Sequence, residues 1–127
     1  MKVLVLGDII IDKYIYGTST RISPEAPVPV ITYKKEVETL GGAGLVYENL
    51  KGLGVDVDLY DTGEESSIKT RVICDGHYIT RIDADKFANG TDVLDKIIND
   101  DFSQYEYVVL SDYNKGVLDE SLRIIQP

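Results

Sequence analysis

Two aspartates follow the first apolar segment of the chain. Residues 2–6 form an apolar run too short for a helix, and residues 9–11 continue it after Gly7 and Asp8. This pattern predicts a buried parallel strand with Asp8 and Asp12 just past its C-terminal end. Because ligands bind at that end of open α/β sheets, the two carboxylates could contact a ligand. The alternative is that they cap turns, and the pair alone favours this simpler role.

Basic side chains gather in two segments. Lys69, Arg71 and Arg81 fall in one predicted hairpin, and Lys115 follows a later strand. Alternation places Lys69 and Arg71 on one face of their strand, and Arg81 joins them across the hairpin only if the register permits. Such a group could hold an anionic ligand. The alternative is that these charges are solvated and discourage edge-to-edge aggregation.

The overall charge limits the kinds of partner. A formal net charge of -9 argues against nonspecific binding to nucleic acid or to an anionic membrane, because both require clustered Lys and Arg. No apolar stretch approaches the roughly 18 residues that span a bilayer. The single cysteine, Cys74, cannot form an internal disulfide, and the chain opens directly on a strand-like run. We therefore expect one globular, cytoplasmic domain over residues 1–127, with no nucleic-acid or membrane partner.

Strands and a helix alternate around these residues. Residues 28–33 predict a β segment that follows the loop 23–27, and the prolines confine it to an edge or a lid. Residues 43–53 predict a helix that opens at Gly41-Gly42, and residues 55–60 predict another strand. Strand, lid, helix and strand in this order are the opening of a parallel α/β sheet.

The clearest local signal is Asp75-Gly76, which lies between β-rich runs at 71–74 and 77–80. It predicts a two-residue type I′ hairpin, in which both turn residues need a positive φ. Farther along the chain, the spacing of apolar residues at 93–98 predicts an amphipathic helix with Thr91 as its N-cap. A buried strand at 107–110 and a last helix at 118–125 complete the predicted elements.

Several of these segments match one family in order and in wording. The matching strings are GDIIIDKYIYG at 7–17, RISPEAPVPV at 21–30, GGAG at 41–44, GLG at 52–54, KTRVI at 69–73, RID at 81–83 and LSDYNKGVL at 110–118. Together they resemble the phosphofructokinase-B/ribokinase family of carbohydrate kinases, and within it the heptose 7-phosphate kinases. The resemblance covers nearly the whole chain, but only the N-terminal, sugar-binding half of such a kinase.

The resemblance implies an α/β, truncated ribokinase-like fold, with a three-stranded parallel core sheet, helices and a small β lid. The lid would comprise about residues 12–36 and 68–84, close over the sugar and form a dimer contact. Asp12 takes the position of the aspartate that binds sugar hydroxyls, and Gly41-Gly42 that of a glycine pair that lets the backbone approach the sugar. The alternative for the glycine pair is a helix-entry turn. The expected substrate site comprises Asp8, Asp12, Gly41, Gly42, Lys69, Arg71, Arg81, Asp112 and Lys115.

Three departures from the family pattern affect the expected activity. The family's D-T-x-G-A-G-D segment, which supplies the anion hole and the catalytic base, is absent from the 127 residues. Residues 58–68 replace an extra α/β unit, and Leu45 stands where the family has an asparagine that contacts the sugar. Phosphoryl transfer depends on positioning and charge stabilisation. We therefore expect no catalytic residue and no cofactor bound by this chain alone, with ATP and Mg²⁺ expected only in a complete kinase.

The sequence thus predicts a heptose 7-phosphate-like sugar kinase protein that is inactive as this chain alone. Its expected partners are a sugar phosphate and either a second copy, in a homodimer through the lid, or a complementing chain. The alternatives are a noncatalytic module for sugar-phosphate binding or dimerisation, and a degenerate kinase remnant. Leu45 leaves the identity of the sugar open.

Overall fold

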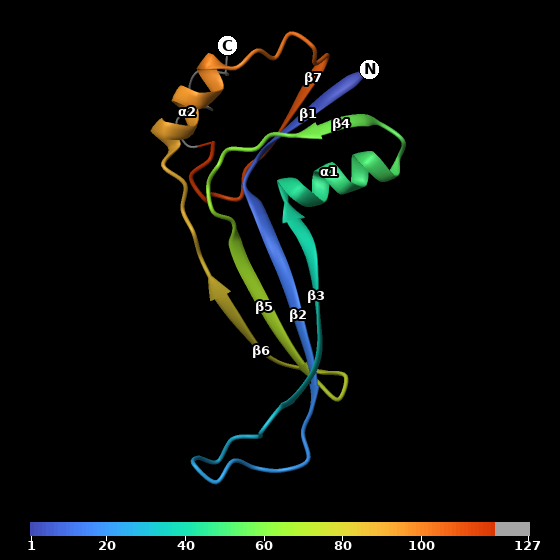
Figure 1. Ribbon diagram of the computed structural model, residues 1–127, viewed down its shortest axis with the longest axis vertical. Helices are drawn as coiled ribbons and strands as arrows, with labels where there is room; N and C mark the ends of the chain where they lie inside the picture. The colour runs from blue at the N-terminus through green and yellow to red at the C-terminus, as the bar shows by residue number, and fades with distance from the viewer. Residues whose placement is uncertain (119–127) are drawn as a thin grey trace.

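Two sheets of different kinds make up the fold. One is a three-stranded sheet of order β4-β1-β7, and the other is a four-stranded sheet of order β3-β2-β5-β6. The computed structural model describes residues 1–118, and it places the first sheet at one end of an elongated molecule, with the second extending away from it (Figure 1). The predicted α/β class, with a three-stranded parallel core sheet and a β lid, is confirmed.

The core sheet is built around β1 (Lys2–Gly7), which pairs in parallel with β4 (Asp56–Leu59) and β7 (Tyr107–Ser111). Its alternating side chains serve two faces. Val3 and Val5 pack against α1 (Ala43–Gly52), whereas Leu6 packs with Val93 of α2 (Gly90–Asn99). Full burial of such a side chain stabilises the fold by about 1.5–3 kcal/mol. A continuous apolar run is therefore what a central strand covered on both faces requires.

The edge position of β7 corrects one prediction. Residues 107–110 do form a strand, but Tyr107 is 59% and Val108 47% exposed, so the strand is not buried. It pairs only with β1, and its outer edge lies free of other strands in the part of the chain that the structure describes.

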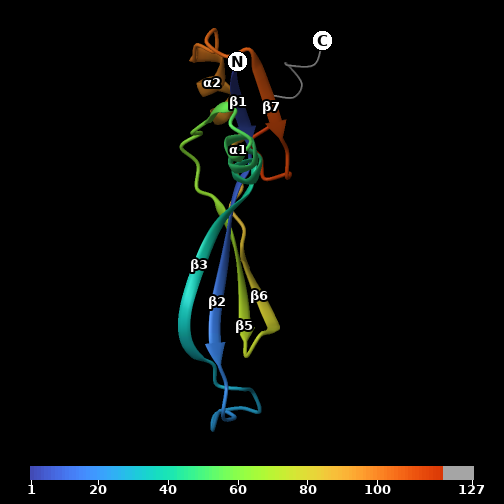
Figure 2. The same ribbon diagram turned by 90° about the vertical axis from the view of Figure 1, so that its right-hand side faces the viewer.

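The lid sheet consists of β2 (Ile9–Thr18), β3 (Thr32–Gly42), β5 (Ser67–Cys74) and β6 (His77–Ala84). Strand β2 is antiparallel to β3 and parallel to β5, and β5 is antiparallel to β6. Seen from the side, the lower part of this sheet is thin, and neither α1 nor α2 covers it (Figure 2). The two helices pack instead on the core sheet.

The chain passes from one sheet to the other at Asp8. Residues 9–11 therefore begin β2. The sequence-based prediction that they continue the core strand is wrong. The ladder of β1 ends where the Asp8 N–H donates to the Ser111 carbonyl at 3.1 Å, and Gly7 has a φ of 158°. A consequence is that Asp12 lies within β2, in the lid, and not at the end of the core strand. An apolar run alone does not reveal a change of sheet.

Other boundaries also differ from the predictions. The second lid strand begins at Thr32 and not at residue 28, because the prolines before it allow only an isolated bridge between Ile22 and Pro29. Helix α2 is capped by Asn89, whose side chain accepts the Thr91 N–H at 3.1 Å, so Thr91 is not the cap. The predicted helix at 118–125 lies, beyond its first residue, outside the described residues.

The predicted hairpin is confirmed. Asp75 and Gly76 have φ values of 50° and 79° and join β5 to β6. The predicted helix at 43–53 and the predicted strand at 55–60 also match α1 and β4 to within two residues at each end. Within residues 1–118, no helix has the length and apolar character needed to cross a membrane.

Candidate functional site

The register of the lid sheet brings most of the predicted site residues to one face. Strand pairing sets Asp12 opposite Lys69 and Tyr14 opposite Arg71, and it sets Arg71 opposite Arg81. Directly opposed residues of neighbouring strands project from the same face of a sheet. The condition left open by the sequence, that Arg81 joins the other cations, is therefore met. Asp83, which is set opposite Lys69, projects from the same face. We call Asp12, Tyr14, Lys69, Arg71, Arg81 and Asp83 the lid face.

An ion pair lies at the centre of the lid face. Arg71 Nη1 donates to Asp12 Oδ1 at 2.8 Å, and the guanidinium lies 5.5 Å from the centre of the Tyr14 ring. The side chains of Asp12 and Arg71 are 21% and 24% exposed, so water screens the pair only in part. The hydrogen bond to Asp12 raises the pKa of Arg71, which keeps the guanidinium charged.

The remaining lid cations differ in their pairing. Arg81 makes two contacts with Asp83, from Nε to Oδ1 at 2.8 Å and from Nη2 to Oδ2 at 2.9 Å. Lys69 forms no ion pair within residues 1–118. A ligand anion on this face would therefore find one cation without a carboxylate partner, beside two that are already paired.

The two adjacent glycines have different neighbours. A Cβ at Gly41 would clash with Asp12 Oδ2, so glycine at this position leaves the carboxylate its place on the lid face. Gly42 has a φ of 59° and lies against the backbone carbonyl of Asp8, which accepts the Ala43 N–H at 2.8 Å. Gly42 also precedes α1 directly, so it acts as the helix-entry turn that the sequence left as an alternative. The role of the pair in approaching a sugar stays a prediction.

Asp8 lies apart from the lid face, at the carboxyl end of β1. Its side chain is buried, and Oδ2 accepts the N–H groups of Tyr113 at 2.8 Å and Lys115 at 3.3 Å, while Oδ1 accepts that of Val117 at 3.2 Å. This carboxylate therefore holds the loop that follows β7. Asp112, in the same loop, accepts the Asn114 N–H at 2.8 Å and is exposed.

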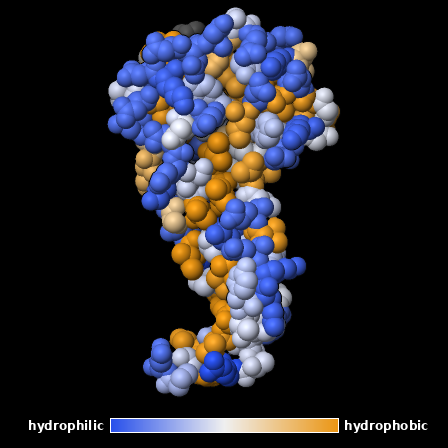
Figure 3. Space-filling view, viewed as in Figure 1, coloured by the Kyte–Doolittle hydropathy of each residue, from blue (hydrophilic) through white to orange (hydrophobic). Residues whose placement is uncertain are grey.

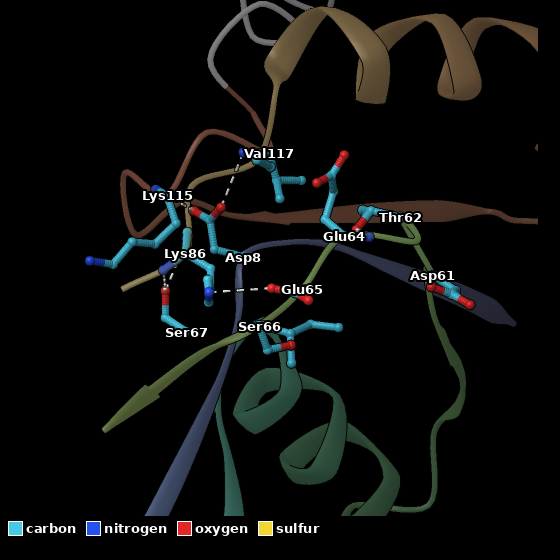
Figure 4. Close-up of a pocket in the computed structure, with 12 residues that line it drawn as sticks. Asp8, Asp61, Thr62, Glu64, Glu65, Ser66, Ser67, Lys86, Lys115 and Val117 are labelled. Atoms are coloured by element: carbon cyan, nitrogen blue, oxygen red, sulfur yellow. Dashed lines mark hydrogen bonds and ion pairs between the residues drawn. The ribbon is translucent and has the colours of Figure 1, made fainter. Parts of the chain in front are cut away.

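A cavity of about 140 Å³ lies at this edge of the core sheet (Figure 4). Lys115 contributes to its lining, but its Nζ pairs with Asp85 Oδ1 at 2.9 Å. Lys86, which also lines the cavity, lies 3.5 Å from Glu65 Oε2. The complete lining is Asp8, Ile9, Asp61, Thr62, Glu64, Glu65, Ser66, Ser67, Lys86, Ala88, Lys115 and Val117. Carboxylates outnumber ammonium groups here, so this cavity is a poor place for an anion.

The structure therefore divides the predicted site into two groups. Asp12, Gly41 and the lid cations gather on the lid face, whereas Asp8, Asp112 and Lys115 lie at the core-sheet edge. Tyr14, which supports the Arg71 guanidinium, was missed from the sequence. The signal for it was available, because a residue two positions after Asp12 in a strand shares its face.

Sequence comparisons place these residues in a known group. Bifunctional protein HldE of Campylobacter curvus is 35% identical over 152 residues, which covers 96% of this chain and 32% of that protein. HldE of Acidiphilium cryptum is 37% identical over 149 residues, covering 92% of this chain and 31% of that protein. The aligned lengths exceed the 127 residues of this chain, so the relatives carry residues that have no counterpart here.

Comparisons with family models and with solved structures do not identify the group. No protein-family model matches the chain. Among solved structures, a carbohydrate kinase from Agrobacterium tumefaciens superposes on 86% of this chain and 44% of its own, with 18% identity and a TM-score of 0.42, which is too low to support an argument. The sequence relatives are therefore what identifies the group. The resemblance to heptose 7-phosphate kinases is confirmed, and the chain is related, over nearly its whole length, to about one third of the HldE proteins.

Proposed function

We propose that this chain binds a sugar phosphate, as the sugar-recognition part of a carbohydrate kinase. The observation that carries the proposal is the lid face, where three cations and the two carboxylates of Asp12 and Asp83 project from neighbouring strands. Sequence similarity to HldE supports a module related to sugar kinases. The choice of a phosphorylated sugar, specifically a heptose 7-phosphate, rests on the cations and on the family resemblance.

The order of the strands predicts how the proposed ligand is oriented across the lid sheet. Across the sheet, Gly41 lies on β3, Asp12 on β2, Arg71 on β5 and Arg81 on β6. Neighbouring strands are about 4.8 Å apart, so the carboxylate and the outermost cation are separated by about 10 Å. Sugar hydroxyls would donate to Asp12 beside Gly41, and the phosphate would lie toward β5 and β6. Guanidinium groups suit phosphate because they donate two parallel hydrogen bonds.

We further propose that these 127 residues alone do not transfer phosphate. Their sequence contains no D-T-x-G-A-G-D segment, and the buried carboxylate of Asp8 is occupied by backbone N–H groups. Positioned charge around the transferred phosphoryl group supplies most of the rate in this chemistry. ATP and Mg²⁺ would be used only where further residues complete the kinase. ATP-dependent phosphorylation of heptose 7-phosphate above a no-protein control would contradict this proposal.

Calorimetric titration with heptose 7-phosphate tests the binding function. We expect Asp12→Asn to weaken binding about tenfold or more, because a hydrogen bond to a charged group is lost. Lys13→Gln is the matched control, since Lys13 lies on the same strand but the opposite face, where it pairs with Glu36 and Glu38. Equal affinities for the parent and Asp12→Asn, or no binding at millimolar ligand, would refute the proposal.

A second candidate function is self-association through the lid. Every residue of β6 is exposed, and Tyr78, Ile79 and Ile82 are among its exposed apolar side chains. Apolar surface also runs along the extended sheet in Figure 3. A second copy of this chain could cover such a surface across a two-fold axis, because each copy offers the same patch. Sedimentation equilibrium at low micromolar concentration tests this, and a stable monomer there would exclude the proposed dimer.

A further inference from the structure

We propose that Arg71 acts as a latch on Asp12, and that the phosphate of the ligand opens it. Without ligand, the guanidinium occupies the carboxylate that the sugar hydroxyls need. A bound phosphate draws the guanidinium away and so frees the carboxylate for the sugar. This inference rests on the proposed function, and it concerns the regulation of that same site.

The two oxygens of Asp12 are in different surroundings. Oδ1 accepts from Arg71 at 2.8 Å, whereas Oδ2 lies on the side of Gly41, where a Cβ would clash with it. A sugar that approaches over the glycine therefore meets a carboxylate already bonded on its other side. The pair is about four-fifths buried, so the ion pair is less weakened by water than one on an open surface. An uncharged sugar must compete with that bond.

The arrangement around Arg71 favours its transfer to a phosphate. Arg81 lies directly opposite Arg71 on β6, so a phosphate near Arg71 also lies near a second guanidinium group, which is paired with Asp83. Lys69 lies two residues before Arg71 on the same face of β5 and has no carboxylate partner within residues 1–118. A phosphate monoester carries a charge of about -1.5 to -2 near neutral pH. Placed among these cations, it offers Arg71 more negative charge than Asp12 does.

The Tyr14 ring gives the guanidinium a fixed support. The ring lies 5.5 Å from Arg71 Cζ and belongs to β2, the strand that carries Asp12. The guanidinium can therefore exchange one acceptor for another while it stays over the same ring. The consequence is that phosphate binding and hydroxyl binding are coupled. The site would then select phosphorylated sugars more strongly than direct phosphate contacts alone would achieve, because a ligand shifts an equilibrium only through its differential affinity for the two states.

Four affinities test the latch. They are those of the parent chain and of Arg71→Met, each for heptose 7-phosphate and for the same heptose without its phosphate. We expect Arg71→Met to bind the phosphorylated sugar about tenfold or more weakly, because a charged hydrogen bond is lost. The same variant should bind the unphosphorylated sugar several-fold more tightly, because Asp12 is free. If Arg71 only contacted the phosphate or only supported the fold, its loss would not tighten the binding of the unphosphorylated sugar.

Arg81→Met is the matched control. Arg81 shares the lid face but pairs with Asp83 and does not bond to Asp12. Its loss should weaken binding of the phosphorylated sugar and leave binding of the unphosphorylated sugar unchanged. If Arg71→Met weakens both sugars by the same factor, the latch is wrong while the binding function stands. If the parent chain binds neither sugar, the proposed function fails.

A measurement on the unmodified chain tests the latch without depending on the folding of a variant. Carbon-13 NMR of the Asp12 carboxyl, recorded while inorganic phosphate is added, should show a saturable shift as the guanidinium leaves. Matched chloride at equal ionic strength should not produce it. A carboxyl signal that responds equally to both anions, or to neither, would overturn the latch.

Discussion

Asp8 and Asp12 are the same residue type and lie close together in the chain, yet their carboxylates have different partners and different roles. Asp8 is 2% exposed, and its oxygens accept three backbone N–H groups of one loop. Asp12 is partly exposed, and its partner is the side chain of Arg71, which is itself partly exposed. The first carboxylate is committed to the fold, whereas the second is the one that the proposed latch would release to a ligand. A carboxylate becomes available to a ligand when it bonds to a side chain that can move.

The same contrast holds for the two sheets. The core sheet has a helix on each face, and its central strand is buried throughout the stretch from Val3 to Gly7. The lower part of the lid sheet has no such cover from α1 or α2, and the edge strand β6 is exposed at every residue. Local stability follows buried apolar contacts, so we expect the lid to open more readily than the core.

The largest expected effect comes from Asp8→Ala. It leaves three N–H groups in a buried loop without an acceptor, and each such group costs about 1–3 kcal/mol. We expect the free energy of unfolding to fall by at least about 3 kcal/mol. Asp12→Ala, the matched variant in the lid, should cost less, about 1–2 kcal/mol, because it removes one partly hydrated ion pair and leaves no buried N–H group without an acceptor. Urea unfolding followed by circular dichroism checks both, and equal losses would remove the distinction between the two carboxylates.

A smaller effect is expected at the tip of the lid. Gly76 has a φ of 79°, and a β-branched residue is poorly tolerated in that region, so Gly76→Val should cost about 1–2 kcal/mol. The cost should remain in the lid, with faster amide exchange in β5 and β6 and unchanged exchange in β1. Asp75→Asn is the control, because asparagine tolerates the left-handed region. Faster exchange throughout the molecule would show that the lid and the core unfold together.

How far the sequence predicts this molecule differs between the two regions. The hairpin was predictable from Asp75-Gly76 because its signal is local, and β1 was predictable because a fully buried strand is continuously apolar. The passage of the chain from β1 into β2 was not predictable. Residues 9–11 are as apolar as the strand before them, and only the pairing with β3 and β5 places them in another sheet.

The candidate site shows the same limit. Alternation predicted that Lys69 and Arg71 share a face, but the position of Arg81 needed the register of β5 and β6. Lys115 does not lie on a strand of the lid: it follows β7, and its Nζ pairs with Asp85, directly after β6. Sequence patterns thus predicted residues of the site that share a strand, whereas residues from distant segments depended on tertiary structure.

Cys74 offers a built-in reporter of lid opening. Its thiol lies in β5 and is buried, and burial, together with the nearby Asp75 carboxylate, raises its pKa. Fewer thiolates are then present at pH 8, so the reaction with a disulfide reagent should be slow. We expect Gly76→Val to speed it roughly tenfold, because local opening exposes the thiol. Asp8→Ala should leave the rate unchanged under native conditions, and a rate that follows global stability instead would contradict an independently opening lid.

The smallest effect is expected at a hydrogen bond on the core side, far from the lid. Tyr105 Oη donates to Asp58 Oδ2 at 2.7 Å, and Lys2 Nζ lies 3.3 Å from the same oxygen. The bond to Asp58, with burial adding to it, raises the pKa of Tyr105 to about 12. The bond from Tyr105 and the contact with Lys2 lower the pKa of Asp58, although burial opposes this.

The signs of the two shifts define where Tyr105→Phe should matter. A raised tyrosine pKa adds stability that is complete below the unfolded value of about 10 and is lost as the pH rises through the folded value. A lowered aspartate pKa adds stability that is present above about 4 and is lost as the pH falls through the folded value. Between these limits, Tyr105→Phe should cost about 1 kcal/mol or less, because the hydrogen bond is near the surface. Urea unfolding at pH 3, 7 and 11 should show the difference between variant and parent at pH 7 and a smaller difference at both extremes. A constant difference across the three pH values would mean that the hydroxyl stabilises this edge independently of the ionisation of Asp58 and Tyr105. No difference at any pH would mean that only the ring, which phenylalanine keeps, contributes.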